Sequence, residues 1–279
     1  QPSPTLAITA KAKALRAGGV DIIGLAAGEP DFDTPALVVE AAIDALRSGF
    51  TRYTPTSGIP DGKEASGAKC LAENGRGVVP NRIVVCFGAK QGLGNALMAT
   101  ISPGDEVLLF APYWATYAEQ VTLAGGRPVV VRTRLEEAFV PSLEAVRAAI
   151  TPQTRAVMIN SPCNPTGAVF PRETLIGIAE LAAEHDLWLI SDEIYERLVY
   201  DGEHLAIASL GPEVAARTIT ISGCSKSYAM TGWRIGFCVA PKAVASTMSN
   251  LQDQVTSNPT SFAQKGAVAA LGLPPAAID

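Results

Sequence analysis

Histidine is scarce in this chain, with only His185 and His204 among 279 residues. Two histidines are too few for a histidine-rich metal centre and leave little choice for a Ser-His-Asp triad, and we expect no metal site. The five cysteines are odd in number and lack C-x-x-C spacing, which argues against a disulfide framework and against a zinc site. This use of cysteine favours a reduced, cytoplasmic compartment.

Long apolar runs and blocks of like charge are missing as well. No segment is apolar over the length needed to span a membrane, and the start Gln1-Pro2-Ser3-Pro4 does not look like a signal peptide. A net charge of -5 without a basic run offers no surface for nucleic acid or for an acidic membrane. Since 48% of the residues are hydrophobic, the chain can bury a large core, and we expect small-molecule partners.

Short apolar runs alternate with helical patterns along the chain. The apolar runs predict strands at 22–27, 83–87, 106–110, 127–131, 156–160, 187–190, 218–221 and 235–240. Helices are expected before Gly18-Gly19, at 34–49 with Thr34 as N-cap, at 95–101, at 142–150 with Ser142 as N-cap, at 172–185, after Pro241 and before 271. This alternation predicts an α/β fold with a mostly parallel central sheet, helices on both faces and ligand-binding residues at strand ends.

Lys226 and Arg234 form the most informative local pattern. Lys226 lies just past the strand predicted at 218–221, and Arg234 follows eight residues later. Desolvation lowers the pKa of a lysine, so that its amine can form an imine, and an arginine can bind a phosphate through two hydrogen bonds. A pyridoxal phosphate (PLP) site requires this pair of groups. The alternative is a strand-loop-strand unit with a surface lysine.

Three further positions suit a flat, anionic coenzyme. The glycine-rich stretch 88–94 leads into a predicted helix, whose N-terminus attracts anions. Trp114 follows a predicted strand and offers a ring face to a pyridinium, although a core tryptophan fits equally well. Asp192 stands at the end of a buried strand, where a carboxylate needs a cation such as a protonated pyridine nitrogen. The alternative role for Asp192 is that of a helix N-cap.

These residues also fall on motifs of one enzyme family. The stretch around Lys226 follows the pattern S-x-S-K-x-x-x-x-x-G-x-R-x-G, with Gly223 in place of the first serine. The stretches G-E-P-D-F at 28–32 and N-P-T-G at 164–167 match two further motifs. From Ser3 to about Leu271 the sequence resembles the fold-type-I, class I aminotransferases, which depend on PLP. It is most similar to their aspartate and prephenate subgroup.

The resemblance implies a role for each matching residue. Lys226 would bind the coenzyme covalently and then move the substrate proton, Asp192 would keep the pyridine nitrogen protonated, and Tyr195 would hydrogen-bond the phenolic oxygen. The other implied coenzyme contacts are Gly88, Ala89, Lys90, Trp114, Asn164, Ser225, Arg234 and, across a dimer interface, Tyr53. The implied substrate contacts are Gly28, Lys90, Trp114 and Asn164, with Ser3 and Thr5 as candidate neighbours of the distal carboxylate that Lys90 would bind. The Asn164–Pro165 peptide bond is expected to be cis.

The resemblance also implies the reaction and the assembly. We expect PLP-dependent transamination between aspartate or glutamate and 2-oxoglutarate, oxaloacetate or prephenate, in a homodimer with shared active sites. The alternatives are an alanine or aromatic aminotransferase, a C-S lyase, or a PLP-binding chain with little activity. Residues 1–30 would contribute to a small domain, and residues 31–279 would form the large PLP-binding domain. Family members carry a further C-terminal segment with an arginine for the substrate α-carboxylate, so a chain ending at Asp279 would transaminate poorly.

Overall fold

The structure, a computed structural model, describes residues 4–24, 28–274 and 277–278. Within these ranges, seven strands form one sheet in the order β1-β7-β6-β5-β4-β2-β3. Their bounds are β1 (Ile83–Cys86), β2 (Glu106–Ala111), β3 (Arg127–Arg132), β4 (Thr154–Asn160), β5 (Trp188–Asp192), β6 (Thr218–Gly223) and β7 (Gly236–Val239). Strands β2, β3, β4, β5 and β6 are parallel to one another, whereas β7 runs antiparallel to both of its neighbours, β1 and β6. The mostly parallel sheet predicted from the sequence is confirmed.

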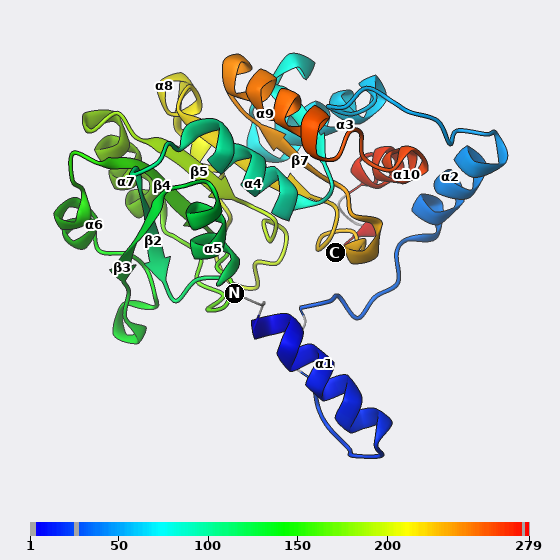
Figure 1. Cartoon of the computed structure of the whole chain (residues 1–279), viewed down its shortest axis with the longest axis horizontal. Helices are drawn as coiled ribbons and strands as arrows, with labels where there is room; N and C mark the ends of the chain where they lie inside the picture. Colours follow the sequence, from blue (N-terminus) through cyan, green and yellow to red (C-terminus); the bar gives the residue numbers. More distant parts are fainter. Residues whose placement is uncertain (1–3, 25–27, 275–276, 279) are drawn as a thin grey trace.

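Helices pack on both faces of this sheet. The helices in the described ranges are α1 (Pro4–Ala17), α2 (Ala36–Arg47), α3 (Pro60–Asn74), α4 (Ala89–Thr100), α5 (Thr116–Leu123), α6 (Leu143–Ala149), α7 (Arg172–Glu184), α8 (Pro212–Ala215), α9 (Lys242–Val255) and α10 (Ser261–Leu271). One apolar core joins the sheet to α4, α5 and α9, and a second joins it to α6 and α7. Helix α1 stands apart from the layered body (Figure 1). None of the helices in the described ranges is long and apolar enough to cross a membrane.

The central strands are buried because helices pack on both of their faces. Leu108, Ile159, Leu189 and Ile219 have no exposed surface. A parallel sheet in this position favours unbroken aliphatic runs rather than an alternation of apolar and polar residues. These runs are the reason why the strands could be located in the sequence.

Three local predictions were wrong. Residues 22–24 form no strand, and the rest of that predicted strand, 25–27, lies outside the described residues. Pro35 rather than Thr34 precedes α2, because the Thr34 hydroxyl donates instead to the Ala229 carbonyl at 2.6 Å. The predicted N-cap at Ser142 is confirmed, since its hydroxyl accepts a hydrogen bond from Ala145 N at 3.4 Å.

The third correction concerns the glycine-rich stretch 88–94, which is helical rather than a loop. Helix α4 already begins at Ala89, so only Gly88 precedes it. A Cβ atom on Gly92 would lie 2.4 Å from Cys238 Sγ. This glycine is therefore required by close packing of the helix on β7, and not by a turn.

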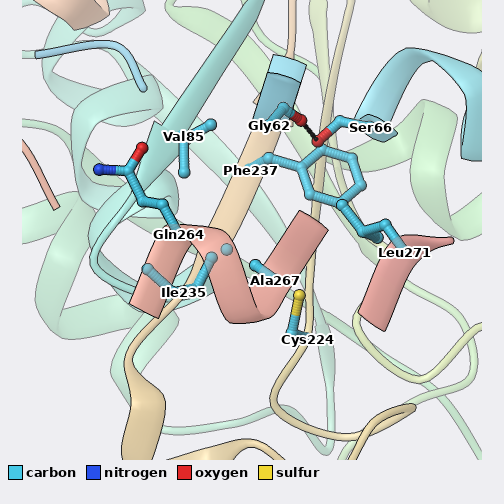
Figure 2. A pocket seen from close by; sticks show the side chains of 10 residues that line it. Gly62, Ser66, Val85, Cys224, Ile235, Phe237, Gln264, Ala267 and Leu271 are labelled. Carbon is cyan, nitrogen blue, oxygen red and sulfur yellow. Dashed lines mark hydrogen bonds between the residues drawn. The ribbon is translucent and has the colours of Figure 1, made fainter. Parts of the chain in front are cut away.

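A small cavity lies where α3 and α10 pack against the sheet (Figure 2). Its volume is about 10 Å³, and its lining includes Val85, Cys224, Phe237 and Ala267. A space of this size holds at most one water molecule. The cavity is a gap in core packing and is far too small for a coenzyme.

Candidate active site

The carboxyl ends of three parallel strands bring the predicted site residues to one edge of the sheet. Asp192, the last residue of β5, pairs with Asn160 of β4 and with Ile221 of β6. Lys226 follows shortly after β6 ends at Gly223. Ligands bind at this edge in open α/β sheets.

Asp192 is the buried acid of the site. Its side chain accepts hydrogen bonds from the Tyr117 hydroxyl at 2.8 Å and from the Ile194 amide at 3.3 Å. Burial raises the pKa of Asp192 to about 6, although both hydrogen bonds lower it. The residues directly after Asp192 form a turn at 194–197 rather than a helix, so the N-cap alternative does not hold. A buried carboxylate of this kind lacks only a cation opposite it.

Tyr117 was missed by sequence reasoning. It lies on α5, has 2% of its surface exposed, and packs edge-on against Trp114 with 5.5 Å between ring centroids. The sequence signal for Tyr117 was its position three residues after Trp114, a residue already predicted to contact the coenzyme. Burial raises the pKa of Tyr117 well above its usual range, so it remains a neutral donor to Asp192.

Lys226 lies half-buried beside two other predicted residues. Its Nζ donates a hydrogen bond to the carbonyl oxygen of Gly28 and lies 5.8 Å from the centre of the Tyr195 ring. Burial lowers the pKa of Lys226, the charge of Glu29 raises it, and the charge of Arg234 lowers it, with a net fall. A lowered pKa favours the neutral, nucleophilic amine.

Asn164 and Tyr195 meet next to Lys226. Asn164 Nδ2 donates to the Tyr195 hydroxyl at 3.3 Å, and the predicted cis bond at Asn164–Pro165 is confirmed. Asn160, a second residue that sequence reasoning missed, fixes this corner. Its side chain accepts from Asn164 N at 2.7 Å and donates to the Asp192 carbonyl at 3.0 Å.

Gly88 and Arg234 form a cradle at the N-terminus of α4. Gly88 has a φ of 76°, and a Cβ atom there would lie only 2.6 Å from Arg234 Nη2. The guanidinium is held by the carbonyl oxygens of Thr231 at 2.8 Å and Phe87 at 3.4 Å. Within the described ranges, no side chain caps the free amides of α4. Amides at a helix N-terminus and a guanidinium together suit a phosphate.

Lys90 extends from the same cradle over Trp114, with 4.7 Å between Nζ and the ring centroid. Partial burial and the charge of Arg234 lower the pKa of Lys90. Ser225 is buried beside Lys226. Tyr53 is not part of this cluster, since 92% of its surface is exposed. Ser3 and the side chain of Thr5 lie outside the described residues.

The arrangement fits PLP. The cradle is suited to bind the phosphate, and the face of Trp114 is suited to stack on the ring. Asp192 would face the pyridine nitrogen, and the Asn164–Tyr195 pair would face the phenolic oxygen. Lys226 would face the aldehyde. The buried, cation-deficient Asp192 and the space that a Gly88 Cβ would fill are the two observations behind this fit.

Comparisons with known proteins agree with this geometry. A family model described as aminotransferase class I and II matches residues 20–277. A probable aspartate/prephenate aminotransferase of Thermus aquaticus is 50% identical over 271 residues, which are 97% of this chain and 70% of that protein. The aspartate aminotransferase of Bacillus subtilis is 46% identical over 98% of this chain and 70% of its own length. The structure of aspartate aminotransferase from Thermus thermophilus with maleate matches with a TM-score of 0.95 and 49% identity, covering 98% of this chain and 70% of that one.

Proposed function

The chain belongs to the class I and II aminotransferase family, whose members depend on PLP, and from this premise we propose its substrates and residue roles. It transfers the amino group of aspartate or glutamate to 2-oxoglutarate, oxaloacetate or prephenate. The observation that carries the proposal is the meeting of a half-buried Lys226, a buried Asp192 and the Gly88–Arg234 cradle at one sheet edge.

Asp192 provides the negative charge at the floor of the site. When bound, PLP supplies a carbonyl for the amino group and a ring that accepts electrons from the substrate. Asp192 holds a proton on the pyridine nitrogen, because its buried carboxylate then gains the cation that it lacks. Tyr117 orients the carboxylate and favours its ionised form through the 2.8 Å hydrogen bond.

Lys226 has two tasks. Its amine would hold the coenzyme at the aldehyde until a substrate amino group takes its place. Once free, the amine takes the proton from the substrate Cα as a general base and returns a proton as a general acid. The lowered pKa of Lys226 favours the neutral amine, which is the form that can act as the general base. Asn164 and Tyr195 orient the reacting centre from the side.

Lys90 selects the substrate. Its ammonium lies beside the Trp114 ring and near Arg234, so this corner is positively charged. A dicarboxylic amino acid places its distal carboxylate there, and a charge-assisted hydrogen bond results. Replacing Lys90 by alanine should lower kcat/KM for aspartate more than for alanine. An equal loss for both substrates would contradict the assignment.

A homodimer completes the proposal. Tyr53 projects from the chain with its ring almost fully exposed, and we assign it to the phosphate of the partner subunit's coenzyme. Residues 1–30 contribute to a small domain and residues 31–279 form the large one. A cytoplasmic location fits the five free cysteines. Sedimentation of the PLP-saturated protein tests the dimer, and a saturated monomer would count against it.

The reaction itself is tested with the PLP-loaded chain. Aspartate and 2-oxoglutarate should yield oxaloacetate and glutamate, and Lys226→Ala should abolish both products while leaving the fold intact by circular dichroism. Release of ammonia or sulfide without glutamate would indicate a lyase instead of a transferase.

A further inference from the structure

A second group of charged side chains, buried or partly buried, lies beside the active site and takes no part in the roles above. Its members are Lys69, Glu73, Glu193, Glu196, Arg197 and His204. Glu193 and Glu196 belong to the segment 192–197, which also carries Asp192 and Tyr195. Any change in this group therefore acts on the catalytic acid through the backbone that they share.

Glu196 is well provided with partners. Its Oε1 accepts hydrogen bonds from Lys69 Nζ at 2.6 Å and from the Ser222 hydroxyl at 2.9 Å. Lys69 also pairs with Glu73 at 2.8 Å, and Arg197 pairs with the other oxygen of Glu73. These contacts tie the segment to α3 and to β6.

Glu193 is less well satisfied, and so is His204. Glu193 is 1% exposed, and its Oε1 accepts from the Ser191 hydroxyl at 2.8 Å, but its Oε2 has no hydrogen-bond partner among the described residues. His204 Nε2 lies 3.6 Å from this Oε2, the His204 side chain is 8% exposed, and neither ring nitrogen is hydrogen-bonded to a residue that the structure describes. A distance of 3.6 Å is too long for a hydrogen bond, yet two charges so close in a buried site attract each other.

Ion pairing shows what Glu193 needs. Lys69 pairs with Glu73 and Glu196, and Arg197 pairs with Glu73. Among the described residues, Arg76 acts on Glu193 through its charge without forming an ion pair with it, and His204 is the residue that lies against the Glu193 carboxylate. A buried charge without a close partner is costly, and a proton on His204 supplies a positive charge beside Glu193.

A metal ion fits less well. The ligand atoms of Glu193, Glu196 and His204 lie within 4.8 Å of one another. A divalent cation there would add two charges instead of one and would compete with Lys69 for Glu196.

We propose that His204 is a positioning residue that carries a proton and, through Glu193, holds segment 192–197 in the geometry that places Asp192 and Tyr195. The charges that face His204 favour the proton. Burial lowers the pKa of His204, whereas Glu193 and Glu196 raise it against the opposing charge of Lys69, and the net result is a raised pKa. Arg76 acts on Glu193 only through its charge, and burial is the main cause of its own lowered pKa.

The proton on His204 also affects the catalytic acid. Burial raises the pKa of Asp192 most, and the charge of Glu193 raises it further. A proton on His204 offsets the charge of Glu193 and so favours the ionised Asp192. This last step rests on the proposed function, whereas the pairing of His204 with Glu193 does not.

The first test is an NMR titration of the two histidine rings in the full chain. The His204→Gln variant identifies the His204 signal by its loss. In the wild-type chain His204 should lose its proton above about pH 6.5, and in Glu193→Gln this midpoint should fall by about one pH unit or more. A wild-type midpoint below 6.5, or an unchanged midpoint in Glu193→Gln, would overturn the proposal. This titration needs no coenzyme, so it stands even if the proposed function fails.

The second test measures the PLP dissociation constant at about pH 5, below the pKa of about 6 of Asp192, where binding of the coenzyme must first ionise this acid. His204→Gln should raise the constant about threefold, the ratio that corresponds to half a pH unit in the pKa of Asp192. Adding Glu193→Gln should restore it, since no charge then needs a partner. His185→Gln is the matched control, because His185 lies at the same 3.6 Å from Glu184 but its side chain is 35% exposed. It should leave the constant unchanged.

Two results, one from the second test and one from thermal unfolding with Zn²⁺, would overturn the positioning role. One is weakened binding in His204→Gln without rescue by Glu193→Gln, which would indicate loss of packing only. The other is a rise in the melting temperature of the wild-type chain, but not of His204→Gln, on addition of Zn²⁺, which would assign the group to a metal. If His204→Gln does not fold, the wild-type and Glu193→Gln titrations still decide, with signals assigned through His185→Gln.

Discussion

Replacing Asp192 by asparagine separates its role in catalysis from its effect on stability. Its carboxylate is 3% exposed, and burial raises its pKa from an ordinary 3.8 to about 6. The folded chain therefore holds this proton more tightly than the unfolded chain does. The resulting contribution to stability is fully present below pH 3.8 and is lost as the pH rises through about 6.

The size of the effect follows from the same two values. The interval between 3.8 and about 6 corresponds to about 3 kcal/mol of lost stability at neutral pH and to about 1 kcal/mol at pH 4.5. Asparagine carries no charge and keeps an acceptor for the Tyr117 hydroxyl. Without PLP, the Asp192→Asn chain should thus be more stable than wild type at pH 7.5 by up to about 3 kcal/mol, and by about 1 kcal/mol at pH 4.5.

Urea unfolding of both coenzyme-free chains at the two pH values measures this difference. With PLP the order should reverse, because the variant lacks the charge that pairs with the pyridinium, and activity should fall by about 10²-fold or more. An Asp192→Asn chain that is less stable than wild type at pH 7.5 without PLP would refute the reasoning. A stability difference that does not change with pH would refute it as well.

Two further substitutions test the surroundings of Asp192 and of the phosphate cradle. Tyr117→Phe removes a hydrogen bond to a buried carboxylate, so at pH 7.5 the coenzyme-free chain should lose about 1.5–3 kcal/mol in urea unfolding, and this loss should shrink at pH 4.5. An equal loss at both pH values would mean that only packing had changed. Gly88→Ala introduces a Cβ atom 2.6 Å from Arg234 Nη2 at a φ of 76°, and PLP titration should show at least about tenfold weaker binding. Unchanged binding would show that the phosphate lies elsewhere.

The sheet and the first residues of the site were predictable because local signals carry them. Aliphatic runs located the central strands, and Asp192 and Lys226 follow the ends of two of them. Tyr117 and Asn160 were missed, because what brings them into the candidate site is a contact with residues distant in the sequence. The Tyr117 hydroxyl meets a carboxylate 75 residues away.

Glycine was the least reliable signal, because one residue type serves different needs. Gly88 combines a positive φ with a close approach to Arg234, as an anion site requires. Gly92 looked equivalent in the sequence, but it lies inside helix α4 and packs against Cys238 of β7. Only the three-dimensional neighbours distinguish the two. The same holds for His204, which sequence reasoning treated only as a scarce residue.

The reversed direction of β7 decides how the phosphate cradle is built. Gly236, the first residue of β7, pairs with Gly223 at the end of β6 and with Cys86 at the end of β1. The connection formed by residues 224–235 therefore returns Arg234 to the edge where Lys226 leaves the sheet, and β1 delivers Gly88 to the same place. A parallel β7 would begin at the opposite edge, about 13 Å away for a four-residue strand. One antiparallel strand thus lets the chain gather three ligand groups at a single edge without a crossover helix between Lys226 and Arg234.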